Sequence, residues 1–189
     1  DADFVASDLL SQAEHGKDSQ AILVTESLAF AEAVQVAVKQ QLATLSRCEI
    51  ATHAMQHARY IVTKSIEQAI EVSNQYAPEH LIVQVNDTDA ALAALTNAGS
   101  IFVGPWSPES AGDYASGTNH VVPTYGYSRH YSSLGLLDFM RRYTVQTLSK
   151  QGLAELGPHI MNLADAEGLD AHRQAVAIRL AKLNQDETI

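Results

Sequence analysis

Four short apolar runs, each rich in β-branched residues, recur along the first half of the chain with longer stretches of helical pattern between them. The runs occupy residues 21–25, 59–63, 81–85 and 100–104. Polar or turn residues bound each run, which is typical of a buried strand. The stretches between them repeat apolar side chains along one helix face, at residues 27–45, 65–76 and 87–99. Because strands and helices alternate with short connections, the sequence predicts the α/β class, with a mainly parallel, doubly wound sheet and flanking helices.

Composition and charge exclude several classes of protein. With 189 residues, 46% of them hydrophobic, the chain can bury one core and a small annex. Lys and Arg number 12 against 22 Asp and Glu, and no basic block occurs, so we expect neither a nucleic-acid partner nor a membrane surface. No apolar run approaches the roughly 18 residues that a membrane span needs. Cys48 is the single cysteine, which rules out an internal disulfide and favours a reducing compartment, the cytoplasm.

The chain changes character after Gly104. Residues 105–133 are rich in Gly, Pro, Ser and Tyr, and a loop of this length in a compact domain usually carries function. Neither GxGxxG nor GxxxxGK[ST] occurs, so the predicted sheet has no nucleotide-binding fingerprint of its own.

Helical periodicity returns in the tail, with a predicted break at Gly157–Pro158 and a last helix that begins at Asp170. We therefore predict an incomplete Rossmann-like α/β domain over residues 1–134 and a C-terminal helical segment over residues 135–189. At the other end, no initiator methionine or signal stretch occurs and a helical pattern has already begun, so we expect residue 1 to be a cut within a longer protein.

Two pairs of polar residues are candidate site residues, and the first pair could bind a metal ion. Gln12 and His15 are three apart at the end of the first helical stretch and share one face, although a polar helix end before Gly16 explains them equally well. Asp113 and His120 lie in the glycine-bearing loop, where the backbone can aim a carboxylate inward. An Asp turn and a solvent-facing histidine are the simpler interpretation of that second pair.

Glu79 and His80 form a titratable pair at the start of the third apolar run. Pro78 excludes Ala77 from a helix, which fixes a turn just before the pair. A regular strand would point the two side chains to opposite faces, whereas an irregular one would let both reach one site. A solvated glutamate and a histidine that caps the preceding helix remain the alternative.

His172 lies on the same stripe of the last predicted helix as Val176 and Leu180. A histidine there faces whatever surface the helix packs against. One hydrogen-bond partner would satisfy its ring, so an interface role explains it as well as a binding role does.

Taken together, four segments resemble histidinol dehydrogenase, in the same order and across nearly the whole chain. They are SQAEHG (11–16), NQYAPEHL (74–81), AGSIFVGPWSPESAGDYASGTNHVVPTYGYSR (98–129) and LDAHRQAVAIR (169–179). The resemblance is to the C-terminal part of the family chain, a little under half of it. It implies a zinc- and NAD-dependent enzyme of histidine biosynthesis that oxidises L-histidinol through L-histidinal to L-histidine.

The resemblance also implies the roles of particular residues. The zinc ligands of the family fall on Gln12, His15, Asp113 and His172. The catalytic acid–base pair falls on Glu79 and His80, with His80 as the acceptor of the alcohol proton and Glu79 as the activator of water for the second oxidation. His120 would lie near the product carboxylate, and Glu167 would bind substrate. All of these except Glu79 are expected to contact the substrate.

Three interpretations therefore remain open. The resemblance implies a catalytic segment of the dehydrogenase that forms a homodimer with exchanged C-terminal helices. In the family, much of the NAD site and part of the substrate site belong to the N-terminal portion, so the chain can instead be a zinc-binding, dimer-forming fragment without turnover. Without the resemblance, the chain would be an unrelated α/β binding module. No NAD-binding residue is identified in this chain.

Overall fold

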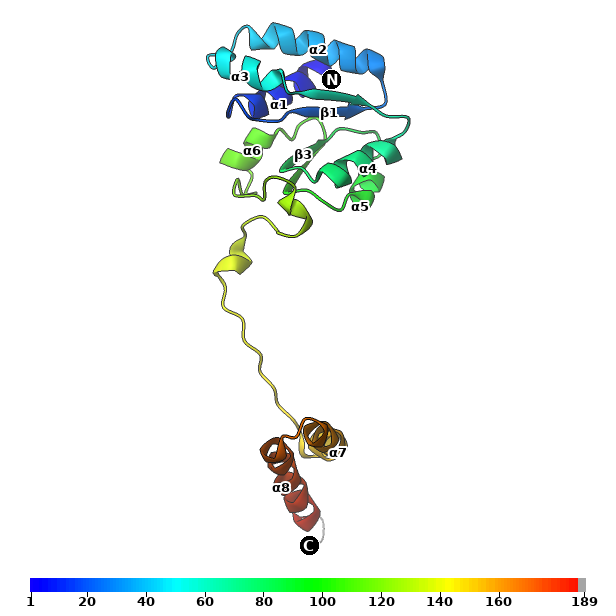
Figure 1. The fold of residues 1–189 in the computed structure, drawn as a ribbon, viewed down its shortest axis with the longest axis vertical. Helices are drawn as coiled ribbons and strands as arrows, with labels where there is room; N and C mark the ends of the chain where they lie inside the picture. The colour runs from blue at the N-terminus through cyan, green and yellow to red at the C-terminus, as the bar shows by residue number, and fades with distance from the viewer. Residues whose placement is uncertain (187–189) are drawn as a thin grey trace. The chain divides into compact units, whose positions relative to one another are not determined.

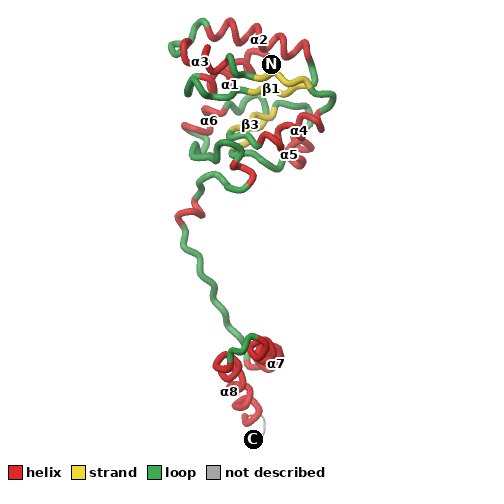
Figure 2. Tube along the Cα trace, in the orientation of Figure 1, coloured by secondary structure: helices red, strands yellow, loops and turns green. Residues whose placement is uncertain are grey.

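The computed structural model of the chain describes residues 1–186, and the chain divides into two compact units, residues 1–139 and 140–189 (Figure 1). The first unit mixes strands and helices, which confirms the predicted α/β class. Figure 2 shows its strands interspersed with helices along the chain, whereas the regular structure of the second unit is helical.

All four predicted strands form: β1 (Ile22–Thr25), β2 (Arg59–Val62), β3 (His80–Val83) and β4 (Ser100–Val103). They pair in parallel as β1 with β2 and β3 with β4, so the described residues contain two short parallel ladders and not one continuous sheet. The helices between paired strands are the crossovers that parallel pairing requires. The register sets His80 opposite Ser100 and Val83 opposite Val103.

The six helices of the first unit are α1 (Ala2–Ala13), α2 (Leu28–Leu42), α3 (Cys48–Met55), α4 (Ile66–Tyr76), α5 (Thr88–Ala94) and α6 (Glu109–Tyr114). Four of the six begin at a capping side chain, and α3 and α6 do not. Asp1, Ser27, Ser65 and Asp87 each accept a backbone N–H at a helix start, as N-caps do. The sequence did not predict α3 or α6, and α5 ends five residues before Gly99, where its predicted stretch ended.

The main core lies where α1 and α2 pack against β1 (Figure 1). Small residues dominate it: Ala6, Ala31 and Ala37 are buried beside Val34, which is fully enclosed. A second cluster joins Ala13 at the end of α1 to Ala51 and Ala54 of α3. Alanine lets helix backbones approach closely, so the end of α1 is held firmly in place.

A strained turn precedes β3. Ala77 adopts a left-handed conformation with φ 55°, which costs an alanine about 1–2 kcal/mol, and the following Pro78 excludes the helical conformation. The loop after α6 secures this turn, because Ser128 donates to the Ala77 carbonyl at 3.0 Å and Arg129 donates to the Gln75 carbonyl. These hydrogen bonds hold the turn directly before Glu79, and His80 follows as the first residue of β3.

The residues at the amino end of β4 pack closely against this turn. A methyl group added at Gly99 would lie 2.5 Å from the Glu79 carbonyl oxygen, which itself accepts the Ser100 N–H at 2.9 Å. Ser133 donates its hydroxyl to the Gly99 carbonyl. The predicted functional loop is thus fastened to the start of β3 and β4, and it contains α6 and a short 3₁₀ helix at Tyr127–Arg129.

The second unit is a pair of helices, α7 (Lys150–Ala166) and α8 (Asp170–Asp186). The predicted break at Gly157–Pro158 is wrong, because α7 continues through Pro158. Proline removes one helical hydrogen bond, but α7 packs closely against α8 at this point. Gly157 leaves no space between them, since a methyl group added there would lie 2.7 Å from Leu180 Cδ1. Arg173 and Asp165 form an ion pair at 3.0 Å beside the connection.

Much apolar surface of the chain is exposed between and along these elements. In the segment that contains the 3₁₀ helix Leu136–Phe139 and leads to α7, the exposed apolar side chains are Leu136, Leu137, Phe139, Met140, Tyr143, Val145 and Leu148. On α7 and α8 they include Leu156, Ile160, Leu163 and Ile178. Among residues 1–186, no helix combines the length and the apolar character needed to cross a membrane.

Candidate metal and acid–base site

The last turns of α1 bring four polar side chains to one side of the helix. Asp8 and Gln12 are four residues apart, as are Ser11 and His15, and such pairs lie one above the other on a helix. The helix ends at Ala13, so His15 follows it in a bend and is exposed, while Gln12 is half-buried. The predicted shared face of Gln12 and His15 therefore extends just beyond the helix end.

His15 is oriented by the backbone. Its Nδ1 lies 2.9 Å from the Ser11 carbonyl oxygen, and a carbonyl can only accept a hydrogen bond. Nδ1 therefore carries the hydrogen, and Nε2 keeps its lone pair free. Metal-binding histidines are commonly held by such a hydrogen bond to the second nitrogen.

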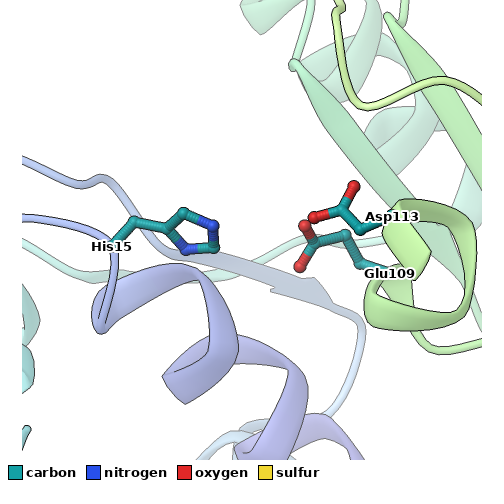
Figure 3. A group of neighbouring side chains, drawn as sticks. All are labelled: His15, Glu109 and Asp113. Atoms are coloured by element: carbon teal, nitrogen blue, oxygen red, sulfur yellow. The ribbon is translucent and has the colours of Figure 1, made fainter.

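The two carboxylates of α6 complete a candidate metal site. Glu109 and Asp113 are four residues apart on this short helix, and their side chains face the ring of His15 (Figure 3). One ligand atom from each of the three residues lies within 4.8 Å of the others. An imidazole nitrogen with two carboxylate oxygens is a donor set that zinc accepts, so these residues fit the zinc ion that the resemblance implies.

His80 reaches the same place from the start of β3. Its Nδ1 lies 3.4 Å from Gln12 Oε1 and 3.6 Å from Glu109 Oε1, and its ring is tilted against Phe102 at 6.0 Å between centroids. The side chains of His80 and Glu109 are only 14% and 6% exposed. The structure thus brings a predicted acid–base residue beside Glu109 of the candidate metal site and beside Gln12, a predicted ligand.

Burial raises the pKa of Glu109; the nearby His80 opposes this effect, and the charge of Asp113 adds to it. The Ser11 hydroxyl lies 3.3 Å from Glu109 Oε2, and its hydrogen bond also lowers the pKa of Glu109. One turn earlier on α1, burial and the charge of Glu109 raise the pKa of Asp8 to about 6, against a hydrogen bond from Gln84.

Within the first unit, Glu79 and His120 make none of these contacts. Glu79 is half-buried. Burial raises the pKa of the neighbouring Tyr76 hydroxyl, and the charge of Glu79 raises it further. His120 is exposed in the loop after α6. In the second unit, Glu167 caps the end of α7 and His172 lies in the first turn of α8; both are exposed within that unit. Val176 and Leu180, on the same stripe as His172, are half-buried.

Sequence reasoning missed Glu109 and Asp8. A helix start was the available signal for Glu109: it follows Pro108 and lies four residues before Asp113, so both carboxylates face one side once a helix forms there. For Asp8 the signal was its spacing of four from Gln12 on the first helical stretch. Nothing in the sequence indicates that either carboxylate is buried.

Comparisons with known proteins agree with the quoted motifs. The family model described as "Histidinol dehydrogenase" matches residues 1–180. Proteins named histidinol dehydrogenase from Vibrio parahaemolyticus and Pasteurella multocida are 60% and 58% identical to this chain, each over 98% of it. A crystal structure of histidinol dehydrogenase from Elizabethkingia anophelis matches 97% of the chain at a TM-score of 0.94 and 49% identity.

The resemblance stated from the motifs is therefore confirmed. The chain spans only part of these proteins: 43% of the Vibrio parahaemolyticus protein, 44% of the Pasteurella multocida protein and 42% of the crystallised chain.

The raised pKa of Asp8 predicts a pH-dependent stability. Between about pH 4 and pH 6 the folded chain holds a proton that the unfolded chain has lost, so ionisation of Asp8 destabilises the fold as pH rises through this window. We expect Asp8→Asn to be more stable than wild type at pH 7 and equal to it near pH 4, measured by urea unfolding at each pH. The control is Asp3→Asn, an exposed position in the first turn of α1, which should be neutral or slightly destabilising at pH 7. A constant difference between Asp8→Asn and wild type across this range would contradict the assignment.

Proposed function

The chain belongs to the histidinol dehydrogenase family, and on that premise we propose that it forms the metal and acid–base part of an enzyme that oxidises L-histidinol through L-histidinal to L-histidine. The observation that carries the proposal is the meeting of His15, Asp113 and His80 around the buried Glu109. The proposal covers the whole enzyme, of which this chain corresponds to under half the length.

Gln12, His15 and Asp113 are proposed as zinc ligands, together with His172 from α8. The free Nε2 of His15 and the half-buried carboxylate of Asp113 support this assignment. When bound, zinc would supply a Lewis acid that holds the imidazole and amino nitrogens of the substrate.

His80 is proposed as the base that takes the alcohol proton in the first oxidation. Its Nδ1 faces two oxygen acceptors, so the hydrogen resides there and Nε2 is free to take the proton from the substrate hydroxyl. Glu79 directly precedes His80 in the chain. It is proposed to take a proton from the water that adds to the aldehyde. Two successive oxidations at one carbon each release a proton, and two adjacent acceptors meet that need.

NAD is proposed as the oxidant, held mainly by the part of the family chain to which this chain does not correspond. The absence of a glycine-rich fingerprint from the sequence supports that division. His120 is proposed to contact the product carboxylate, and Glu167 the substrate.

The first test is zinc content. We expect the chain to bind one zinc ion per subunit, and His15→Ala to lower the affinity by more than about 100-fold, because changes outside the ligand set already cost roughly 10–100-fold. His53→Ala, at an exposed histidine of α3, is the matched control and should leave zinc binding unchanged. Metal analysis after dialysis measures both, and equal zinc in wild type and in a His15→Ala, Asp113→Ala double variant would refute the site.

The second test separates the roles of the acid–base pair. It uses a fused enzyme, made by joining this chain to the portion of the Vibrio parahaemolyticus relative that it does not match. There, His80→Asn and Glu79→Gln should each lower turnover by roughly 10²- to 10⁴-fold while zinc content stays intact. His57→Asn and Glu32→Gln, at exposed positions, are the controls.

Glu79→Gln should impair oxidation of L-histidinal more than oxidation of L-histidinol, because only the second step needs water. Equal losses in the two half-reactions would show that its role is different. A fused wild-type enzyme that binds zinc but does not turn over would favour the alternative of a zinc-binding fragment.

We also propose a homodimer in which His172 and Glu167 serve the site of the partner chain. The exposed His172 and the apolar surface of the second unit support it, since both require another surface to contact. In the fused enzyme, mixing His172→Ala chains with Asp113→Ala chains should restore activity to about half of wild type per heterodimer, because both lesions then fall in one site. An inactive mixture despite demonstrated subunit exchange would mean that His172 serves its own chain.

A further inference from the structure

The imidazole of His80 has two oxygen acceptors in front of one ring nitrogen. Nδ1 lies 3.4 Å from Gln12 Oε1 and 3.6 Å from Glu109 Oε1, both beyond the usual 2.7–3.2 Å of an N–H···O hydrogen bond. A small rotation of the ring or of either acceptor would complete one bond at the expense of the other. In both cases Nδ1 carries the hydrogen and Nε2 does not.

Glu109 has an acceptor to spare. Oε2 is near the Ser11 hydroxyl, at 3.3 Å, whereas Oε1 is buried and has no hydrogen-bond partner within the part of the chain that the structure describes. A buried oxygen without a partner is rare in a folded protein and indicates either a function or a missing ligand. The nearest donor in the described contacts is the His80 ring.

The side-chain oxygen of Gln12 has two possible partners, the His80 ring and the metal ion. In the proposed function this oxygen is a zinc ligand, and an oxygen engaged by a cation is a weaker acceptor for the His80 N–H. We propose that Glu109 is a positioning residue, which accepts the Nδ1–H of His80 when the oxygen of Gln12 binds the metal ion and so keeps Nε2 free to act as the base. This inference rests on the proposed function, but its first test does not require an active enzyme.

That test reads the tautomer of His80 in the metal-free, 189-residue chain from the ¹⁵N shifts of its ring nitrogens, under conditions where the ring is neutral. Gln12→Met removes the glutamine oxygen with little change of shape and imitates its capture by a metal ion. We expect His80 to remain in the Nδ1–H form in Gln12→Met, because Glu109 takes over. Adding Glu109→Leu should release the ring into a mixture of the two tautomers.

The control is Asp8→Asn in the Gln12→Met background, which removes a neighbouring carboxylate that has no described contact with His80. It should leave the Nδ1–H form dominant. If Gln12→Met alone releases the tautomer, Glu109 does not accept from His80 and the proposal is overturned. Should Glu109→Leu fail to fold, Glu109→Gln keeps the test open: its amide oxygen can still accept, so the Nδ1–H form should persist in Gln12→Met, Glu109→Gln.

The second test uses the fused enzyme. Glu109→Leu should lower kcat by roughly 10–100-fold with KM for L-histidinol and zinc content nearly unchanged, and Glu109→Gln should recover most of the loss. If Glu109→Leu instead abolishes zinc binding, Glu109 is a metal ligand and the positioning role is wrong. An inactive wild-type fusion would count against the proposed function alone, since the tautomer measurement in the isolated chain stands separately.

Discussion

The buried carboxylate of Glu109 requires polar partners from the elements around it, helix α1 and strand β3. Glu109 is 5% exposed, and loss of water destabilises its charge unless polar groups replace it. Those groups come from separate parts of the chain: Ser11 near the end of α1 and His80 at the start of β3. Because Asp113 follows one turn later on α6, the same contacts that accommodate Glu109 also direct a second carboxylate toward His15.

The backbone around β3 keeps this arrangement in place. Ala77 is held in a left-handed conformation, and the loop after α6 donates to its carbonyl through Ser128. Just before β4, Gly99 leaves room for the Glu79 carbonyl. Any side chain at position 99 would displace that carbonyl, because its Cβ would lie 2.5 Å from the oxygen. The loop that carries Glu109 and Asp113 therefore also contacts the turn before Glu79 and His80, and so links the proposed metal-binding groups to the proposed acid–base pair.

Local sequence predicted the regular elements well and their limits less well. The four β-branched runs became the four strands, and the Ser27, Ser65 and Asp87 caps start helices, because strand pattern and capping depend on nearby residues. The continuation of α7 through Pro158 depends instead on α8, which lies against Gly157. The sequence did not predict helix α6 because a helix of six residues, three of them small (Ser110, Ala111 and Gly112), carries almost no periodic signal.

The sequence by itself determined the α/β class, the family motifs and six residues of chemical interest in the first unit. It could not determine that the buried Glu109 lies beside His15, His80 and Asp113, because burial is produced by the packing of α1, β3 and α6 and not by any one segment. The same limit applies to Asp8, whose pKa rises to about 6 through burial and the charge of Glu109. Spacing specifies which side chains share a helix face, whereas only the tertiary structure decides which of those faces lose water and which charges then meet.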